Sequence, residues 1–217
     1  DWIAFSFGYW GDPVTYTLNT QNSSNFENIG GSTYDDTLTG DASGNIILGG
    51  KGNDDIYGAA GDDTLYGGIG ESCGSNNNLS NDKGWGVGLY NNHDYQGAGI
   101  DRLFGEAGND TLYGQCLDDY LDGGLGADVL HGGDGSDTFV IRSGDGGNTI
   151  EEADVIQDFA VGTDVIGLDG ISFNDLTIEQ GSGSYSTDTI VKLGVAFIAR
   201  LKNIDANVIS DVDFTPI

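Results

Sequence analysis

Basic residues are scarce in this chain of 217 residues, which has 7 Lys and Arg against 35 Asp and Glu and a formal net charge of −28. Nucleic acids and anionic membrane surfaces bind proteins mainly through clustered basic side chains. We therefore expect neither as a direct partner. We expect bound cations to balance the acidic charge instead.

Long apolar runs are also missing, because no stretch reaches the length of about 18 apolar residues that indicates a membrane-spanning helix. The chain opens with Asp1 and Trp2 and lacks the basic segment that begins a signal peptide. We expect no membrane insertion. Because 37% of the residues are hydrophobic and recur at regular positions, we expect a folded chain rather than a disordered acidic one.

Groups for catalysis are few, since His93 and His131 are the only histidines. The chain has no H-E-x-x-H zinc signature, no credible triad and too few histidines for a three-histidine zinc site. The sequence therefore predicts a protein that is not an enzyme, with an enzyme fragment as an alternative. We expect His131 to lie on a surface, whereas His93 beside Asp94 is an alternative metal ligand.

Cysteine is limited to Cys73 and Cys116. An even pair in an acidic, glycine-rich chain favours a disulfide and an extracellular setting, with two reduced thiols as the alternative.

What the sequence does contain is a repeat of nine residues, seen most clearly in G-G-K-G-N-D-D-I-Y (49–57) and G-A-A-G-D-D-T-L-Y (58–66). The sixth position carries a carboxylate and the eighth an aliphatic residue, so each repeat predicts a six-residue loop and a three-residue strand. Frames begin at residues 22, 31, 40, 49 and 58, and again at 96, 105, 114, 123 and 132. The sixth positions are Glu27, Asp36, Asn45, Asp54, Asp63, Asp101, Asp110, Asp119, Asp128 and Asp137. The eighth positions are Ile29, Leu38, Ile47, Ile56, Leu65, Leu103, Leu112, Leu121, Leu130 and Phe139.

Two nonapeptides make one coil, so successive loops alternate between two sides and each loop stacks on the loop two repeats away. Calcium takes six to eight oxygen ligands, and glycine-rich loops can turn several carbonyls toward it. The aliphatic core is thin, so we expect folding to be coupled to calcium. The expected pairs are Asp36 with Asp54, Asn45 with Asp63, Asp101 with Asp119, Asp110 with Asp128, and Asp119 with Asp137.

The repeats divide the chain into three parts. Residues 1–21 hold two short alternating segments and predict an N-terminal strand cap, with an aromatic ligand surface as the alternative use of Trp2, Phe5, Phe7, Tyr9 and Trp10. Residues 22–140 predict the repeat array. Residues 141–217 predict a C-terminal β cap with strands near 154–159, 164–168, 176–179 and 189–193.

An insertion at about residues 71–95 interrupts the array. The frame that begins at Gly67 breaks at Ser72, and the register returns at Gln96, which predicts about 20 inserted residues. The insertion is either a packing flap over the array or a carbohydrate contact built from Trp85, Tyr90 and Tyr95. A disulfide between Cys73 and Cys116 would fasten it to the array.

Residues 22–140 resemble the calcium-binding β-roll of RTX exoproteins, a family that includes serralysin-type proteases. The segment D-V-I-Q-D-F (154–159), followed by G-T-D-V-I (162–166), is similar to the D-x-I-x-D-F-x-x-G-x-D-x-I segment that follows the roll in serralysins. The resemblance implies that carbonyls at positions two and four and the carboxylate at position six bind calcium. It implies weak or empty sites at Asn45, at Ser72, and at Gln115 and Leu117 beside Asp119. The implied metal residues are Asp36, Gly50, Gly52, Asp54, Ala59, Gly61, Asp63, Gly97, Gly99, Asp101, Glu106, Gly108, Asp110, Asp119, Gly124, Gly126, Asp128, Gly133, Gly135 and Asp137.

Together these observations predict an all-β fold: a right-handed parallel β-roll with an N-terminal strand cap and a C-terminal β cap. The resemblance implies several Ca²⁺ ions and a non-catalytic module of a secreted or cell-surface bacterial protein, exported by a type I route and folded by external calcium. The alternative is a module for polysaccharide binding or surface assembly that uses the insertion.

Overall fold

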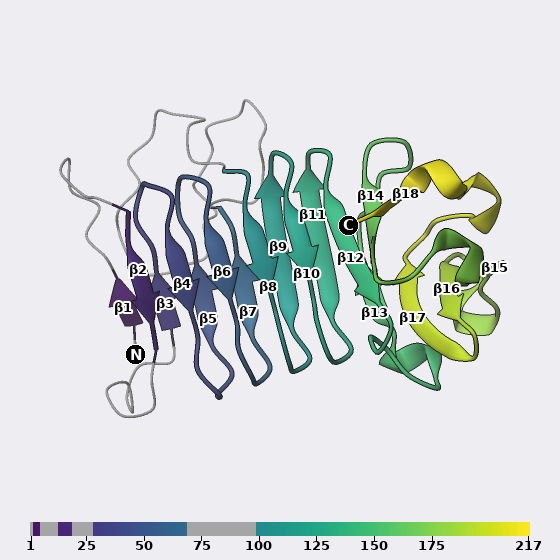
Figure 1. Cartoon of the computed structure of the whole chain (residues 1–217), viewed down its shortest axis with the longest axis horizontal. Helices are drawn as coiled ribbons and strands as arrows, with labels where there is room; N and C mark the ends of the chain where they lie inside the picture. The colour runs from purple at the N-terminus through teal and green to yellow at the C-terminus, as the bar shows by residue number, and fades with distance from the viewer. Residues whose placement is uncertain (1, 5–12, 19–27, 69–98) are drawn as a thin grey trace.

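The computed structural model describes residues 2–4, 13–18, 28–68 and 99–217. Within these residues the regular structure consists of β-strands and single-turn 3₁₀ helices. Two sheets run the length of the molecule and face each other (Figure 1). No helix in the described part of the chain has the length and apolarity to cross a membrane.

Each sheet collects every second strand of the repeat region. The ten-stranded sheet contains, in spatial order, β1 (Trp2–Ala4), β3 (Asn28–Gly30), β5 (Ile46–Leu48), β7 (Thr64–Tyr66), β9 (Thr111–Cys116), β11 (Val129–Asp134), β13 (Asp154–Ile156), β17 (Ala196–Leu201), β16 (Thr189–Leu193) and β15 (Leu176–Gln180). The eight-stranded sheet contains β2 (Thr15–Thr17), β4 (Thr37–Thr39), β6 (Asp55–Tyr57), β8 (Arg102–Phe104), β10 (Tyr120–Asp122), β12 (Thr138–Arg142), β14 (Val165–Asp169) and β18 (Phe214–Pro216).

Neighbouring strands in the roll are parallel and offset by one coil. Leu38 faces Ile56 across β4 and β6, and Ile47 faces Leu65 across β5 and β7. This alternation is what a nine-residue repeat dictates, because three strand residues followed by a six-residue loop send the chain to the opposite sheet each time. The parallel β-roll predicted from the sequence is confirmed.

The eighth position of every described repeat points into the space between the sheets. Its side chain is fully buried in each case: Ile29, Leu38, Ile47, Ile56, Leu65, Leu103, Leu112, Leu121, Leu130 and Phe139. Burial of one aliphatic side chain stabilises a fold by about 1.5–3 kcal/mol. The core is therefore continuous along the roll but only one side chain deep from each strand.

The seventh and ninth positions point outward, and aromatic rings at position nine stack from coil to coil. Ring centroids lie 4.9 Å apart for Tyr57 with Phe104, 4.9 Å for Tyr66 with Tyr113, and 4.6 Å for Tyr113 with His131. These spacings match the separation of adjacent strands, about 4.8 Å. His131 is half-buried at the outer surface of the ten-stranded sheet.

The N-terminal strands continue the two sheets. Strand β1 pairs with β3 in the ten-stranded sheet, whereas β2 pairs with β4 in the other. The two strands of the expected N-terminal cap therefore lie in different sheets and do not pair with each other.

The C-terminal region also grows from the roll. Strands β13 and β14 add one further parallel strand to each sheet, and β15, β16 and β17 form an antiparallel meander on β13. The sequence did not reveal β17 and β18. Short 3₁₀ helices connect these strands: η2 (Ile150–Glu152), η3 (Phe173–Asp175), η4 (Gly183–Tyr185), η5 (Ala206–Val208) and η6 (Asp211–Asp213).

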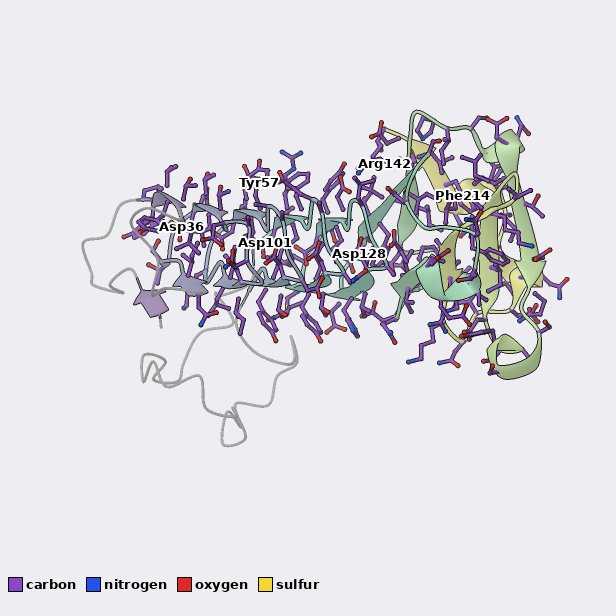
Figure 2. All side chains as sticks on the ribbon, turned by 90° about the horizontal axis from the view of Figure 1, so that it is seen from below. Asp36, Tyr57, Asp101, Asp128, Arg142 and Phe214 are labelled. Carbon is purple, nitrogen blue, oxygen red and sulfur yellow. The ribbon has the colours of Figure 1, made fainter. Side chains whose placement is uncertain are left out.

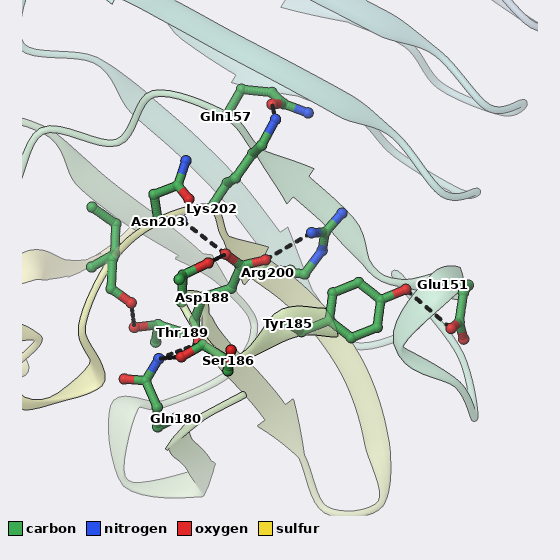
Figure 3. Close-up of polar contacts among 12 residues, drawn as sticks. Glu151, Gln157, Gln180, Tyr185, Ser186, Asp188, Thr189, Arg200, Lys202 and Asn203 are labelled. Atoms are coloured by element: carbon green, nitrogen blue, oxygen red, sulfur yellow. Dashed lines mark hydrogen bonds and ion pairs between the residues drawn. The ribbon is translucent and has the colours of Figure 1, made fainter. Parts of the chain in front are cut away.

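A polar network fastens the meander (Figure 3). Asp188 accepts hydrogen bonds from the Arg200 guanidinium at 2.8 Å and from the backbone N–H of Asn203 at 3.0 Å. Arg200 also lies over the ring of Tyr185, whose hydroxyl donates to Glu151 at 3.1 Å. The network joins the end of β17 to the turn between β15 and β16.

Candidate metal centre

The loops of the roll form two rows, one along each side. One row contains residues 31–36, 49–54, 114–119 and 132–137, and the other contains 40–45, 58–63, 105–110 and 123–128. Figure 2 shows Asp36, Asp101 and Asp128 spaced along the roll and Tyr57 at its outer surface. Each sixth-position side chain therefore recurs at the spacing of the strands.

In the loops that begin at residues 49, 58, 105, 114 and 123, positions two and four adopt left-handed backbone angles. Gly50 and Gly52 have φ of 118° and 106°, and Gly124 and Gly126 have φ of 93° and 148°. The same conformation occurs where glycine is replaced: Ala59, Glu106, Gln115 and Leu117 have φ of 81°, 72°, 84° and 75°. These five loops thus keep one shape despite substitutions that cost about 1–2 kcal/mol each, whereas the loops that begin at residues 31 and 40 have no positive φ at these positions.

The loop glycines are also needed because carbonyl oxygens of the neighbouring loop approach them. A Cβ built on Gly50 would lie 2.3 Å from the carbonyl oxygen of Ser32, and one on Gly126 would lie 1.6 Å from that of Gly108. Carbonyl oxygens of positions two and four therefore face the next loop in the row. Such oxygens are ligands that calcium prefers.

The sixth-position carboxylates link each loop to the loop before it in the same row. In each link Oδ1 accepts a hydrogen bond from the backbone N–H of the preceding sixth-position residue. The five expected pairs have N···Oδ1 distances of 2.8 Å for Asp36–Asp54, 2.6 Å for Asn45–Asp63, 2.8 Å for Asp101–Asp119, 2.8 Å for Asp110–Asp128 and 2.9 Å for Asp119–Asp137. The structure therefore brings together the residues that the eighteen-residue coil predicted, with one carboxylate in each gap.

Apart from Asp36, the second oxygen of these carboxylates has no hydrogen-bond partner among the described residues. The Oδ2 atoms of Asp54, Asp63, Asp101, Asp110, Asp119, Asp128 and Asp137 are buried without a hydrogen bond. Burying an ionised carboxylate without a counter-charge costs several kcal/mol or more. A divalent cation in each gap satisfies these atoms, so the residues present fit calcium.

Burial also changes the proton affinity of these groups. Removal from water raises the pKa of Asp54 to about 9 and that of Asp119 to about 8, because the charged form is disfavoured more than its backbone hydrogen bond favours it. Burial likewise raises the pKa of Asp101 and Asp137 to about 7. Without a cation, carboxylates of this row such as Asp54 and Asp119 therefore stay protonated at neutral pH.

Asp36 and Asn45 are the first described sixth-position residues of the two rows, and they differ from the rest. Asp36 Oδ1 accepts from the N–H of Val14 at 2.7 Å, and its Oδ2 accepts from the N–H of Ser32. Asn45 Oδ1 accepts from the N–H of Asp41 at 2.7 Å, while its Nδ2 lacks a partner. Both carboxylate oxygens of Asp36 thus have backbone donors, from Val14 and from its own loop, and Asn45 brings no charge.

The rows continue across the insertion without a gap. The N–H of Asp54 donates to Asp101 Oδ1 at 2.7 Å, and that of Asp63 donates to Asp110 Oδ1 at 2.7 Å. Gly67 takes the first position of the loop that ends at Asp101, since a Cβ on Gly67 would lie 2.3 Å from Asp101 Oδ2. Gly67 thus takes the position that the sequence predicted for Gln96, which itself lies outside the described residues. The insertion lies inside one loop, between Gly68 and Gly99.

A second set of links at position five was not evident from the repeat pattern. The N–H of Asn53 donates to Asp35 Oδ1 at 2.9 Å, and the N–H of Asn109 donates to Asp62 Oδ1 at 2.9 Å. These bonds run in the opposite direction to those at position six. The enrichment of Asp and Asn at position five was the available signal.

Several predicted residues lie outside the described part of the chain: Cys73, Trp85, Tyr90, Tyr95 and Gly97. The described cysteine, Cys116, is half-buried at the end of β9. Their roles in a disulfide, a carbohydrate contact and a calcium site remain predictions.

The donor set differs from that of a site made only of side chains. Among the described residues, no three His, Cys, Asp or Glu side chains converge to hold a metal ion. Each gap instead offers one carboxylate and several carbonyl oxygens, which suits a hard cation such as calcium rather than zinc. Stacked glycine loops with one buried carboxylate per gap define a calcium-binding β-roll.

The family comparison agrees with this class. The model of the RTX calcium-binding nonapeptide repeat matches residues 27–50, 39–71, 95–115 and 117–151. Four copies of this calcium-binding repeat are therefore matched in these residues, and such repeats bind several Ca²⁺ ions.

Solved structures include two similar proteins. The extracellular lipase LipA from Serratia marcescens is 19% identical with a TM-score of 0.40, and the match covers 87% of this chain and 40% of the lipase. The AlgE6R3 subunit of the Azotobacter vinelandii mannuronan C5-epimerase is 22% identical with a TM-score of 0.34, covering 84% of this chain and 78% of that subunit. The chain thus spans less than half the length of the lipase. No curated protein sequence gives a significant match.

Proposed function

We propose that this chain is a non-catalytic module, belonging to a secreted or cell-surface bacterial protein, that folds when it binds external calcium. The observation that carries the proposal is the double row of buried Oδ2 atoms without protein partners, represented by Asp54 and Asp63. These atoms give the folded chain a strong affinity for cations that the unfolded chain lacks.

Among the described residues, no basic side chain forms an ion pair with a sixth-position carboxylate. The ion pairs among the described residues join Arg102 to Asp55, Arg142 to Asp122 and Asp169, Lys192 to Glu179, and Arg200 to Asp188. None of these carboxylates is at position six. Because calcium is millimolar outside cells and far scarcer in cytoplasm, a cation that binds only the folded state acts as a folding trigger at export.

The test is circular dichroism during a calcium titration, with an excess of chelator as the reference and magnesium as the ionic control. We expect the far-ultraviolet β-signal and a cooperative thermal transition to appear with calcium and to be lost with chelator. Equal β-signal and equal melting temperature in chelator would show that folding does not depend on the metal.

Export by a type I route is part of the same proposal, because that route requires a chain that stays unfolded inside the cell. A bacterial host carrying a type I exporter tests it by comparing culture medium with cells. Retention of the chain in cells, or export only after folding in added calcium, would count against this route.

A disulfide between Cys73 and Cys116 is proposed as a second fastening of the insertion. The expected mass under non-reducing conditions is two hydrogens lower than after reduction. Two free thiols in the folded, calcium-loaded protein would exclude it.

The insertion supports a second candidate function, contact with an extracellular polysaccharide or with other copies at a cell surface. The supporting observation is that the roll continues from Asp54 to Asp101 without the insertion, so this segment is dispensable for the stacking of the coils. Deleting residues 74–95 is expected to leave calcium-induced folding intact. Loss of glycan binding or self-association in that variant supports this function, and unchanged binding contradicts it.

A further inference from the structure

The carboxylate rows extend beyond the glycine repeats at the C-terminal end of the roll. In one row the N–H of Asp128 donates to Asp154 Oδ1 at 3.0 Å, and in the other the N–H of Asp137 donates to Asp164 Oδ1 at 3.0 Å. Backbone bonds show the same register, since Val155 N–H donates to the Asp128 carbonyl at 2.8 Å. Asp154 and Asp164 therefore occupy sixth positions, although no glycine loop precedes either of them.

Asp154 and Asp164 stand at the C-terminal ends of the two rows, and their second carboxylate oxygens differ in hydrogen bonding. Asp164 Oδ2 accepts from the N–H of Ala160 at 2.7 Å, within a turn that the Ala160 carbonyl also closes. Asp154 Oδ2 is buried without a hydrogen-bond donor among the described residues, and Asp154 has a relative exposure of 0%. Asp164 is thus satisfied by its own backbone, as Asp36 is at the other end of that row. Asp154 shares the unsatisfied state of the repeat aspartates.

A second buried carboxylate, Asp145, adds negative charge near Asp154. Asp145 is buried with a relative exposure of 1%, and its Oδ1 also lacks a partner. The nearby cation, Arg142, directs its guanidinium to Asp122 and Asp169 and gives Asp145 only its backbone N–H. Within the described residues, no Lys or Arg pairs with Asp154 or Asp128.

The loop before Asp154 in the row is a regular glycine loop. Residues 123–128 have left-handed Gly124 and Gly126, the conformations that turn carbonyls toward the following loop elsewhere in the roll. The gap between this loop and Asp154 therefore offers the same donor types as a repeat gap, a buried carboxylate and backbone carbonyls.

We propose that Asp154 binds one additional calcium ion in the gap that follows the 123–128 loop, although Asp154 lies outside the last glycine loop, and that Asp164 binds none. The inference rests on the calcium-dependent function proposed above. Because β13 carries Asp154 and pairs with both β11 and β17, this ion joins the roll to the C-terminal meander.

The test compares Asp154→Asn with Asp164→Asn in the full chain. Both substitutions keep the Oδ1 acceptor and the side-chain volume and remove one charge. Native mass spectrometry in calcium is expected to count one ion fewer in Asp154→Asn than in the wild type and the same number in Asp164→Asn. The same count in Asp154→Asn as in the wild type, or one ion fewer in both variants, would overturn the proposal. A wild type that binds no calcium would instead refute the general function.

An anomalous difference map of the wild type crystallised in calcium tests the proposal if Asp154→Asn does not fold. A peak is expected about 2.3–2.6 Å from Asp154 Oδ2 and none beside Asp164 Oδ2. Calcium peaks in the repeat gaps with none beside Asp154 would contradict the site.

Discussion

Gly67 and Asp101 form the first and sixth positions of one calcium-type loop although the whole insertion separates them in sequence. A Cβ on Gly67 would lie 2.3 Å from Asp101 Oδ2, the same distance that relates Gly49 to Asp54 within an uninterrupted loop. Gly99 completes the loop, since its Cβ would meet the carbonyl oxygen of Gly52 at 1.6 Å. In the sequence of this loop, the insertion therefore stands in place of a single residue, the third, between Gly68 and Gly99.

Replacing residues 69–98 by one asparagine is expected to restore a regular repeat, G-G-N-G-I-D-R-L-F, and to preserve calcium-induced folding. Gly67 stacks on Gly49 and Gly99 on Gly52, so one residue spans the distance that Lys51 spans in the loop below. The shorter loop also lowers the entropy lost on closure. Circular dichroism and melting with calcium measure the result.

The deletion variant also carries Cys116→Ser, and its matched control is the full chain with Cys73→Ser and Cys116→Ser, so that neither protein has a lone thiol. Retained β-signal and a melting temperature equal to or above that of the control support the loop assignment. Loss of calcium-induced folding in the deletion variant, but not in the control, contradicts it.

The calcium-free roll is expected to be more stable at pH 5 than at pH 8. The pKa of Asp54 is raised to about 9 and that of Asp63 to about 7 in the fold, so the folded state holds protons that the unfolded state releases above its ordinary pKa near 4. Stability from these groups is therefore complete below about pH 4 and is lost as pH rises toward 9. In calcium we expect the stability of the roll to rise with pH instead, because the ion takes the place of the bound protons.

Thermal melts in chelator and in calcium across this pH range check the prediction, and a pH-stat measures protons released when calcium is added at pH 7. A calcium-free roll that gains stability with rising pH, or calcium binding without proton release, would show that the carboxylates are not the linked groups.

Leu117→Gly is expected to stabilise the calcium-loaded fold by about 1 kcal/mol, because Leu117 holds a left-handed φ of 75° and is half exposed. Leu125→Gly is the control, since Leu125 is also exposed at 59% but has no positive φ, and the change there should destabilise by up to about 1 kcal/mol. Denaturant unfolding in saturating calcium compares the two. Equal destabilisation by both changes would rule out relieved strain at Leu117.

Asp188→Ala is expected to destabilise the C-terminal meander by about 3 kcal/mol, because it leaves the largely buried Arg200 without its carboxylate. Glu179→Ala is the matched control, since Glu179 pairs with Lys192 with 46% of its side chain exposed and should cost less than about 1 kcal/mol. Unfolding curves monitored by near-ultraviolet dichroism report both. Similar losses for the two variants would mean that the Asp188 network adds little.

The repeat period predicts most of the roll because it determines three things at once. Position eight must face inward for Leu65 and Leu112 to be buried, the loops must take left-handed angles that favour glycine, and aspartates must recur at the strand spacing. The pairing of Asp36 with Asp54 follows directly from that period.

The ends of the roll were harder to predict because their partners are distant in sequence. Asp154 and Asp164 join the rows through strand pairing that no glycine repeat announces. Strand β17 pairs with β13 although β14, β15 and β16 lie between them in the sequence. The loop that contains Gly67 was misread for a similar reason: a pattern of nine residues reveals that a frame is broken but not which residue across the break completes it.

The most direct test of the account is a crystal structure of the protein grown in calcium, with an anomalous difference map to locate the ions. We predict peaks about 2.3–2.6 Å from the buried Oδ2 atoms of Asp54 and Asp128, one peak for each gap. A well-ordered roll in which these oxygens have no cation and bind only protein hydrogens or water would contradict the central claim.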